Sequence, residues 1–330
     1  MQLRSFPVVA RTTEELRPPL ARRTLSLWRL MLALGRPSSW VLPMIALASG
    51  ALASGAVTLD RDHALRLVCG LLLAGPLMGG MNAVVNALFD RDIDAINCPD
   101  RPLPSGQIST NAVIAQMGLM SLAILLYAHF LEAGLGTHLD SRLGLGTSNA
   151  GGIFLLVALT LGLIFAENAP PLSLRRNTWL SGVFFGVIAV LLPWLMGNLL
   201  FGPLTLASTL YGVSFGLGAV GLLILLALRK VEGDRRVGVR SLSALLGPEV
   251  GVAIGAIMVD TAYLAAGILM AGQRWVSVAA LGVLLALQVA LQVWFLRRRV
   301  PPRWTLAAAI ALFGAGMIVS AATLMSRTSL

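Results

Sequence analysis

The stretch N-A-L-F-D-R-D-I-D-A-I-N-C-P-D-R-P-L-P-S-G, residues 86–106, carries the strongest information in the chain. It ends an apolar run with four aspartates, two arginines and two asparagines. Asn86, Asp90 and Asp94 recur every four residues, so on a helix they lie on one face within roughly 80° of each other. Oxygen ligands on one face suit a hard divalent cation, and Mg²⁺ is the usual choice where phosphate supplies other ligands. The stretch therefore predicts a metal and diphosphate site at a membrane surface. The simpler alternative is a charged loop between two membrane helices.

The composition of the 330 residues is that of a polytopic helical membrane protein. Hydrophobic residues make up 57% and charged residues 12%, with a mean hydropathy of +0.82, and apolar runs of about 20 residues repeat along the chain. The net charge of +10 is expected from basic residues near membrane ends, so no nucleic-acid partner is predicted. Cys69 and Cys98 are too few for a disulfide framework or a metal cluster. Residues 1–24 lack the apolar segment of a cleavable signal peptide.

The apolar runs predict an all-α fold with nine membrane spans, preceded by a cytoplasmic tail and interfacial helix at residues 1–34. The transmembrane domain then occupies residues 35–330. The expected spans are 38–57, 64–86, 111–132, 151–167, 178–199, 205–228, 249–271, 275–296 and 304–325. Pro43, Pro76 and Pro193 fall inside spans, where neighbouring groups must satisfy the carbonyls that they free.

The distribution of basic residues predicts the orientation. With nine spans and a cytoplasmic N-terminus, 20 of the 25 lysines and arginines fall on the cytoplasmic side. This asymmetry favours a multi-pass protein of an inner membrane, either the cytoplasmic membrane or a photosynthetic intracytoplasmic membrane. The same orientation exposes residues 86–106 to cytoplasmic diphosphate metabolites.

A second polar island, R-K-V-E-G-D-R-R-V-G-V-R-S-L, follows the sixth span at residues 229–242. It again combines acids with arginines and is expected on the same side as the first island. Acids can hold a metal, while arginines bind phosphate oxygens in bidentate fashion. A loop of internal ion pairs on the positive side of the membrane is the alternative.

The two islands and several further motifs resemble the UbiA superfamily of intramembrane prenyltransferases, and most closely its chlorophyll and bacteriochlorophyll synthase branch. The resemblance extends over roughly residues 30–260. The motifs that carry it are G-R-P-S-S-W (35–40), G-L-L-L-A-G-P-L-M-G-G-M (70–81), F-D-R-D-I-D-A-I-N-C-P-D-R-P-L-P-S-G (89–106), A-P-P-L-S-L-R-R-N (169–177), L-P-W (192–194) and V-E-G-D-R-R-V-G-V-R-S-L (231–242).

The resemblance implies nine helices around a central cavity and transfer of a geranylgeranyl or phytyl group from its diphosphate to the propionate of a chlorophyllide. Mg²⁺ is the implied cofactor. The implied partners are the prenyl diphosphate, a tetrapyrrole acceptor, the lipid bilayer and photosynthetic pigment-assembly proteins. By analogy, the catalytic residues are Asn86, Asp90, Asp94, Glu232 and Asp234. The metal ligands among them are Asn86, Asp90, Asp94 and Asp234, and the residues expected to bind diphosphate are Arg101, Arg235 and Arg240.

The sequence departs from that branch near the expected chemistry. Leu226 and Ala227 stand where the family usually has Asn-Asp, and Ala87 replaces the aspartate of N-D-x-x-D. Val220, Glu167 and Cys98 replace the branch's histidine, tyrosine and glutamate. Two hypotheses follow. The chain is an active prenyltransferase with a modified site, or a non-catalytic paralogue that binds pigment or lipid or assists assembly. A transporter is a third alternative, and it rests only on the spans and on Asp260 within the seventh one.

Overall fold

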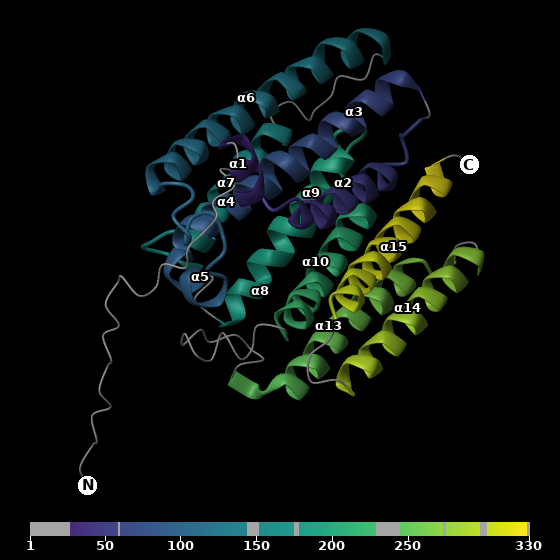
Figure 1. Cartoon of the computed structure of the whole chain (residues 1–330). Coiled ribbons are helices and arrows are strands. Elements are labelled where there is room, and N and C mark those ends of the chain that lie inside the picture. The colour runs from purple at the N-terminus through teal and green to yellow at the C-terminus, as the bar shows by residue number, and fades with distance from the viewer. Residues whose placement is uncertain are drawn as a thin grey trace, which may run out of the picture.

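The computed structural model describes most of the chain as helices joined by short connections (Figure 1). The described residues are 27–58, 60–143, 152–174, 178–228, 245–272, 275–297 and 302–328. The expected tail at 1–24 and the second polar island at 229–242 lie outside them.

All regular elements of the described residues are helical, as the apolar runs predict. In chain order they are α1 (Leu27–Leu34), η1 (Pro37–Ser39), α2 (Val41–Ala53), α3 (Arg61–Leu72), η2 (Leu73–Gly79), α4 (Gly80–Phe89), α5 (Arg91–Asn97), α6 (Thr110–Leu143), α7 (Gly152–Asn168), α8 (Thr178–Gly186), η4 (Val187–Leu191), α9 (Leu192–Leu199), α10 (Leu206–Ala227), α13 (Pro248–Leu269), α14 (Trp275–Leu296) and α15 (Arg303–Thr328).

Each of the nine expected spans coincides with helix, but two of these helices are shorter than a membrane crossing. Seven helices of the described part are long and apolar enough to cross, or eight if α1–η1 and α2 form one bent span. This pair bends by 57° where Gly35, Arg36 and Pro37 interrupt the helix. Here α2 has 13 residues, and α7 has 17. The expectation of nine full-length crossings is therefore met only in part.

Prolines inside two spans coincide with local changes of helix type. Pro76 lies within η2, a π-helical segment that joins α3 to α4 in one span from Arg61 to Phe89. Pro193 follows the π-helical segment η4 in the span made by α8, η4 and α9. A wider helical turn accommodates the carbonyl that proline cannot satisfy, so neither span is broken.

The helices pack as a bundle in which successive long helices run in opposite directions, with α5 at one end and the C-terminal end of α15 at the other (Figure 1). The larger apolar core involves α2, α9, α10, α13 and α15. Four aromatic rings pack at its centre with ring centroids 5.5–6.4 Å apart. Trp194 stacks on Phe215, while Phe215, Tyr263 and Phe313 meet edge to face.

A second core joins α2, η2, α4, α6, α7 and α9. The second core includes Met81 and Val85 of α4, and a third, smaller cluster packs Val84 and Ala87 of the same helix against Leu34 and Leu103. The helix that leads into the first polar island is therefore packed on two sides.

The crossing of α2 over α9 requires glycine at two positions. A Cβ atom on Gly50 would collide with the backbone oxygen of Trp194, and one on Gly197 would collide with that of Leu47. The two backbones therefore approach directly, as small residues permit in membrane bundles.

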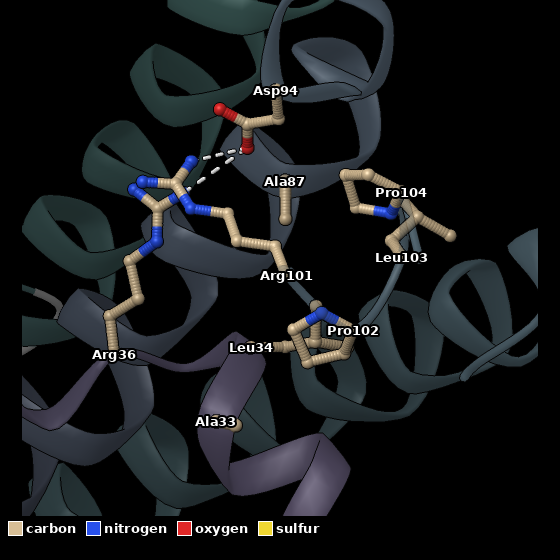
Figure 2. Close-up of a pocket in the computed structure, with 9 residues that line it drawn as sticks. All are labelled: Ala33, Leu34, Arg36, Ala87, Asp94, Arg101, Pro102, Leu103 and Pro104. Atoms are coloured by element: carbon tan, nitrogen blue, oxygen red, sulfur yellow. Dashed lines mark hydrogen bonds and ion pairs between the residues drawn. The ribbon is translucent and has the colours of Figure 1, made fainter. Parts of the chain in front are cut away.

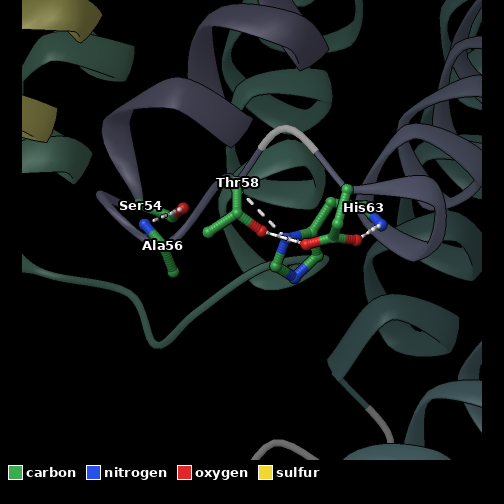
Figure 3. A network of polar contacts seen from close by, with 5 residues as sticks. Ser54, Ala56, Thr58 and His63 are labelled. Atoms are coloured by element: carbon green, nitrogen blue, oxygen red, sulfur yellow. Dashed lines mark hydrogen bonds and ion pairs between the residues drawn. The ribbon is translucent and has the colours of Figure 1, made fainter.

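The connection between α2 and α3 is fixed by a polar cluster of Thr58, Asp60 and His63 (Figure 3). Asp60 is the N-cap of α3, where its carboxylate accepts a hydrogen bond from the backbone nitrogen of His63 at 2.8 Å. The Thr58 hydroxyl contacts both the Asp60 carboxylate and the His63 ring. These interactions, led by the Thr58 hydroxyl, lower the pKa of Asp60. The polar contacts of the His63 ring, with the Thr58 nitrogen, the Thr58 hydroxyl and the Asp60 carboxylate, all use Nδ1. The cluster is therefore a helix cap and lacks the geometry of a hydrolytic triad.

Asp260 of α13 accepts a hydrogen bond at 2.9 Å from the side-chain nitrogen of Gln292 on α14. The bond joins two neighbouring apolar helices within the bundle. The transporter hypothesis rested on this acid, which the structure shows to be engaged in a helix–helix contact.

Candidate functional site

The predicted oxygen ligands form a single row, which we call the file, on consecutive helical turns at the junction of α4 and α5. Its members are Asn86, Asp90 and Asp94. Asp90 separates the two helices, with φ −95° and ψ 10°. The hydrogen-bond pattern nevertheless continues across it, since the nitrogen of Asp90 donates to the Asn86 oxygen at 2.9 Å and that of Asp94 to the Asp90 oxygen at 2.7 Å. The expected shared face of Asn86, Asp90 and Asp94 is therefore preserved at the junction.

The carboxylate of Asp94 is shared by two arginines (Figure 2). Arg101 forms a close ion pair with it, and Arg36 approaches the same oxygen at 3.5 Å. Asp94 is only 6% exposed, whereas the arginine side chains are 27–30% exposed. One carboxylate between two guanidinium groups leaves a local net positive charge, which suits an anionic ligand.

Arg36 is a member of this site that the sequence analysis did not single out. It has a left-handed backbone conformation, with φ 45° and ψ 77°. The turn that carries it is fixed by bonds from the Ser39 hydroxyl to the Arg36 oxygen and from the Trp40 ring nitrogen to the Gly35 oxygen, each 2.7 Å long. The signal that could have identified it is an arginine between a helix-breaking glycine and a proline, directly before a span on the side of the first island.

A pocket of about 200 Å³ lies beside this ion-pair cluster, and we call it the outer pocket. Its lining comes from the end of α1, from α4, from α5 and from the loop after α5 (Figure 2). The lining residues are Ala33, Leu34, Arg36, Ala87, Asp94, Arg101, Pro102, Leu103 and Pro104. Ala87, which replaces an aspartate of the family motif, thus forms an apolar part of the wall close to Asp94.

Asn86 provides a test of whether the site suits a metal cation. Its side-chain oxygen Oδ1 is buried and accepts no hydrogen bond within the described part of the chain. A buried acceptor without a donor is costly, and a cation would satisfy it. No group of three His, Cys, Asp or Glu side chains is gathered for a metal among the described residues. An amide oxygen and the Asp90 carboxylate on one face nevertheless fit Mg²⁺.

The second half of the predicted site lies outside the described residues. This applies to Glu232, Asp234, Arg235 and Arg240. The flanking helices α10 and α13 are described, and α10 ends at the same end of the bundle as α5 (Figure 1). Near that end, Leu226 packs against the larger apolar core.

The other departures from the branch pattern have ordinary packing roles or lie near the site. Val220 is buried in α10, where it faces Gly182 and Gly186. Cys98 caps the end of α5. Glu167 is buried near the end of α7.

Known proteins are similar to this chain along nearly its whole length. The model of the UbiA prenyltransferase family matches residues 24–317. A chloroplastic chlorophyll synthase of Avena sativa is 32% identical over 277 residues, which cover 82% of this chain and 69% of the plant protein. The 33 kDa chain of bacteriochlorophyll synthase from Rhodobacter capsulatus is 29% identical over 326 residues, covering 91% of this chain and 95% of that protein.

Solved structures share the same fold. A UbiA homologue from Archaeoglobus fulgidus, bound to DMAPP and Mg²⁺, superposes with a TM-score of 0.66 over 90% of this chain and 99% of that chain. The sequence identity is 18%. This likeness establishes the arrangement of helices and leaves the chemistry to be argued from the residues.

Proposed function

Because the chain belongs to the UbiA prenyltransferase family, we propose that it transfers a geranylgeranyl- or phytyl-type group from its diphosphate to the carboxylate of a (bacterio)chlorophyllide-like tetrapyrrole. The observation that carries the proposal is the pair of guanidinium groups on Asp94, at the end of a file of oxygen ligands and beside the outer pocket. The acceptor is inferred from the two relatives described above, a chlorophyll synthase and a bacteriochlorophyll synthase chain.

The arginines bind the leaving group in this proposal. Carboxylate and diphosphate oxygens are alternative partners for the same guanidinium groups, so Arg36 and Arg101 can bind both Asp94 and the diphosphate. Breaking the allylic C–O bond places negative charge on the diphosphate oxygens, and preorganised cationic donors stabilise that charge. In the outlying second island, Arg235 and Arg240 are proposed to bind the same group.

Asn86, Asp90 and Asp94 are the residues proposed to hold Mg²⁺, with Asp234 contributing from the second island, where Glu232 is a further proposed catalytic residue. When bound, Mg²⁺ would neutralise the charge that develops on the diphosphate. The presence of Mg²⁺ with DMAPP in the homologue from Archaeoglobus fulgidus supports this assignment. The buried, unsatisfied oxygen of Asn86 supports it independently.

The acceptor needs little activation. A carboxylate is already deprotonated at neutral pH and is itself the nucleophile, so no serine, cysteine or histidine base is required. Its oxygen forms a bond to the prenyl carbon as the bond to the diphosphate oxygen breaks, and the electron pair leaves with the diphosphate. The apolar helix walls exclude water, which would otherwise compete for the allylic cation.

The proposal includes a cytoplasmic N-terminus and an inner membrane or photosynthetic intracytoplasmic membrane. This orientation is supported by the excess of lysine and arginine on the side of the membrane that carries the first polar island. On that side, the site meets soluble diphosphates while the bundle interior meets lipid-soluble groups.

A non-catalytic role in binding pigment or lipid is the second candidate, and Leu226 is the observation that favours it. A leucine packed against the core cannot provide the oxygen of the family's Asn-Asp pair. The two functions are separated by supplying purified protein with Mg²⁺, geranylgeranyl diphosphate and chlorophyllide, and measuring the esterified pigment. Turnover by the native chain supports the enzyme. No turnover in the native chain, but turnover after Leu226→Asn with Ala227→Asp, supports the binding protein.

A further inference from the structure

A second, deeper pocket of about 60 Å³ lies between α2, η2, α4, α7 and the span that contains η4 and α9. We call it the inner pocket. Most of its wall is apolar and includes Met78, Phe185, Ile188 and Met196. Three polar side chains also line it, and these are Ser39, Asn82 and Thr160.

Asn82 extends the file of site residues into this pocket. It lies on α4 one helical turn before Asn86, so the two side chains share a face of the helix. The file therefore runs Asn82, Asn86, Asp90, Asp94 from the inner pocket to the outer pocket. Its outer half is acidic, whereas its inner half consists of neutral amides.

The amide of Asn82 is held at only one end. Its oxygen accepts from the side-chain nitrogen of Asn168 at 3.5 Å, and the same nitrogen donates to the Ile164 oxygen at 2.8 Å. Within the described residues, the Asn82 nitrogen Nδ2 donates no hydrogen bond, although it can donate two. Asn82 is partly exposed and lines the inner pocket, so a ligand that brings an oxygen there can accept a hydrogen bond from its amide.

We propose that Asn82, oriented by Asn168, binds the carboxylate of the acceptor. The inference rests on the proposed function and assigns the acceptor's end of the site. Among the file residues, the aspartates repel a carboxylate, while the amides can donate to it. The diphosphate is drawn to the opposite end by Arg36 and Arg101. The two reactants would therefore meet between the pockets, with the prenyl carbon between them.

A neutral donor also preserves the nucleophile. An arginine or lysine at this position would form an ion pair with the carboxylate and reduce its reactivity. An amide N–H fixes one carboxylate oxygen and leaves the other for bond formation. Ester formation removes the charge from the product, which then binds the amide less strongly than the carboxylate does.

The test is binding of each substrate alone to the purified full chain, with Asn82→Leu as the main variant. Chlorophyllide is titrated by its absorbance change and geranylgeranyl diphosphate by calorimetry with Mg²⁺. We expect Asn82→Leu to weaken chlorophyllide binding about tenfold or more, the effect of losing a hydrogen bond to a charged group. Binding of the diphosphate is expected to stay within twofold of the native chain.

Thr160→Val is the matched control, because Thr160 lines the same pocket but its hydroxyl already donates to the Leu156 oxygen at 2.7 Å. It should bind both substrates as the native chain does. The methyl ester of chlorophyllide is the matched ligand. It should bind the native chain more weakly than chlorophyllide, and Asn82→Leu should not weaken its binding further. Asn82→Gln, which keeps the amide, should retain more chlorophyllide affinity than Asn82→Leu. This result would show that the loss in Asn82→Leu comes from the missing amide and not from misfolding.

The inference is overturned if Asn82→Leu binds chlorophyllide like the native chain, or if it loses the diphosphate instead. Failure of the proposed function shows in a different measurement, because the native chain would then form no esterified pigment from chlorophyllide and geranylgeranyl diphosphate, whether or not it binds chlorophyllide. Native binding that is insensitive to Asn82 would leave the proposed function standing and remove only the assignment of this residue.

Discussion

The charge of the outer pocket depends on the Asp94 carboxylate and the guanidinium groups of Arg36 and Arg101. Because Asp94 is buried, water screens its ion pairs less than it screens an ion pair at the surface. The positive excess of this trio would attract an anion to a site that is otherwise rich in aspartates. Its members come from positions far apart in the chain, since Arg36 and Asp94 are separated by 58 residues.

Replacing either arginine is expected to weaken the use of the prenyl diphosphate. In Arg36→Ala and Arg101→Ala, the KM for geranylgeranyl diphosphate should rise about tenfold or more, because each removes a charge-assisted hydrogen bond. The KM of Arg101→Lys should lie between those of the native chain and Arg101→Ala, since lysine keeps the charge but not the planar guanidinium group. Steady-state kinetics with varied diphosphate measures the effect. Arg91→Ala is the control, because Arg91 is exposed and bonds Thr110 at 3.2 Å; an equal loss in that variant would contradict the assignment.

The helix cap at Asp60 predicts a pH dependence of stability. The pKa of Asp60 is lowered in the folded chain, chiefly by the Thr58 hydroxyl and then by the backbone N–H of His63. The stabilisation is therefore present above the ordinary carboxyl pKa and is lost as the pH falls through the lowered value. The difference in Tm between the native chain and Asp60→Asn, measured in detergent, should shrink as the pH falls from about 6 to about 3. A difference that grows with acidification would contradict this.

Among the helices, the α2–α9 crossing is the most demanding contact. Gly50→Ala forces a Cβ atom into the Trp194 carbonyl oxygen, and overpacking of this kind costs roughly 1–3 kcal/mol. Gly118→Ala on α6 is the control, because nothing lies within 4 Å of its Cβ position. Thermal unfolding in detergent should show a lower Tm for Gly50→Ala and an unchanged or higher Tm for Gly118→Ala. Equal Tm values for the two would mean that the crossing is looser than described.

The Asp260–Gln292 bond predicts non-additive stability changes between α13 and α14. Gln292→Leu alone leaves the acid without its donor and should lower the free energy of unfolding by about 1 kcal/mol. Adding Asp260→Leu should recover most of this loss, because both polar groups are then removed. Unfolding by titration with sodium dodecyl sulfate, applied as a double-mutant cycle, measures the coupling. Losses that simply add would show that the bond contributes no coupling.

The sequence predicts an element well when the interactions that form it are between residues close together in the chain. Apolar runs and a four-residue repeat are local, so the helices and the shared face of Asn86, Asp90 and Asp94 could be predicted. The bend before α2 required knowledge of how Gly35, Arg36 and Pro37 fold together, and this shortened the expected span at 38–57. The role of Arg36 and the contact of Asn82 with Asn168 depend on tertiary packing, which no local pattern encodes.

At the scale of the whole molecule, one face of α4 and α5 runs from the outer pocket, which two arginines line, to the largely apolar inner pocket. Apolar contacts hold α4 in place, and α5, which carries the acidic part of this face, lies at one end of the bundle (Figure 1). This arrangement suits a reaction that releases a charged leaving group and forms a lipid-soluble product. The family membership gives the reaction class. The direction in which we propose that the substrates meet follows from the file of residues.

The most direct measurement compares three purified chains with Mg²⁺, geranylgeranyl diphosphate and chlorophyllide, and quantifies the esterified pigment by chromatography. The native chain should form the ester. Asp90→Ala should lose nearly all activity, because it removes an oxygen ligand from the file, while Asp92→Ala should keep it, because Asp92 is exposed and lies off that face. Equal activity of the Asp90 and native chains, or no ester from the native chain, would contradict the proposed prenyl transfer at this site.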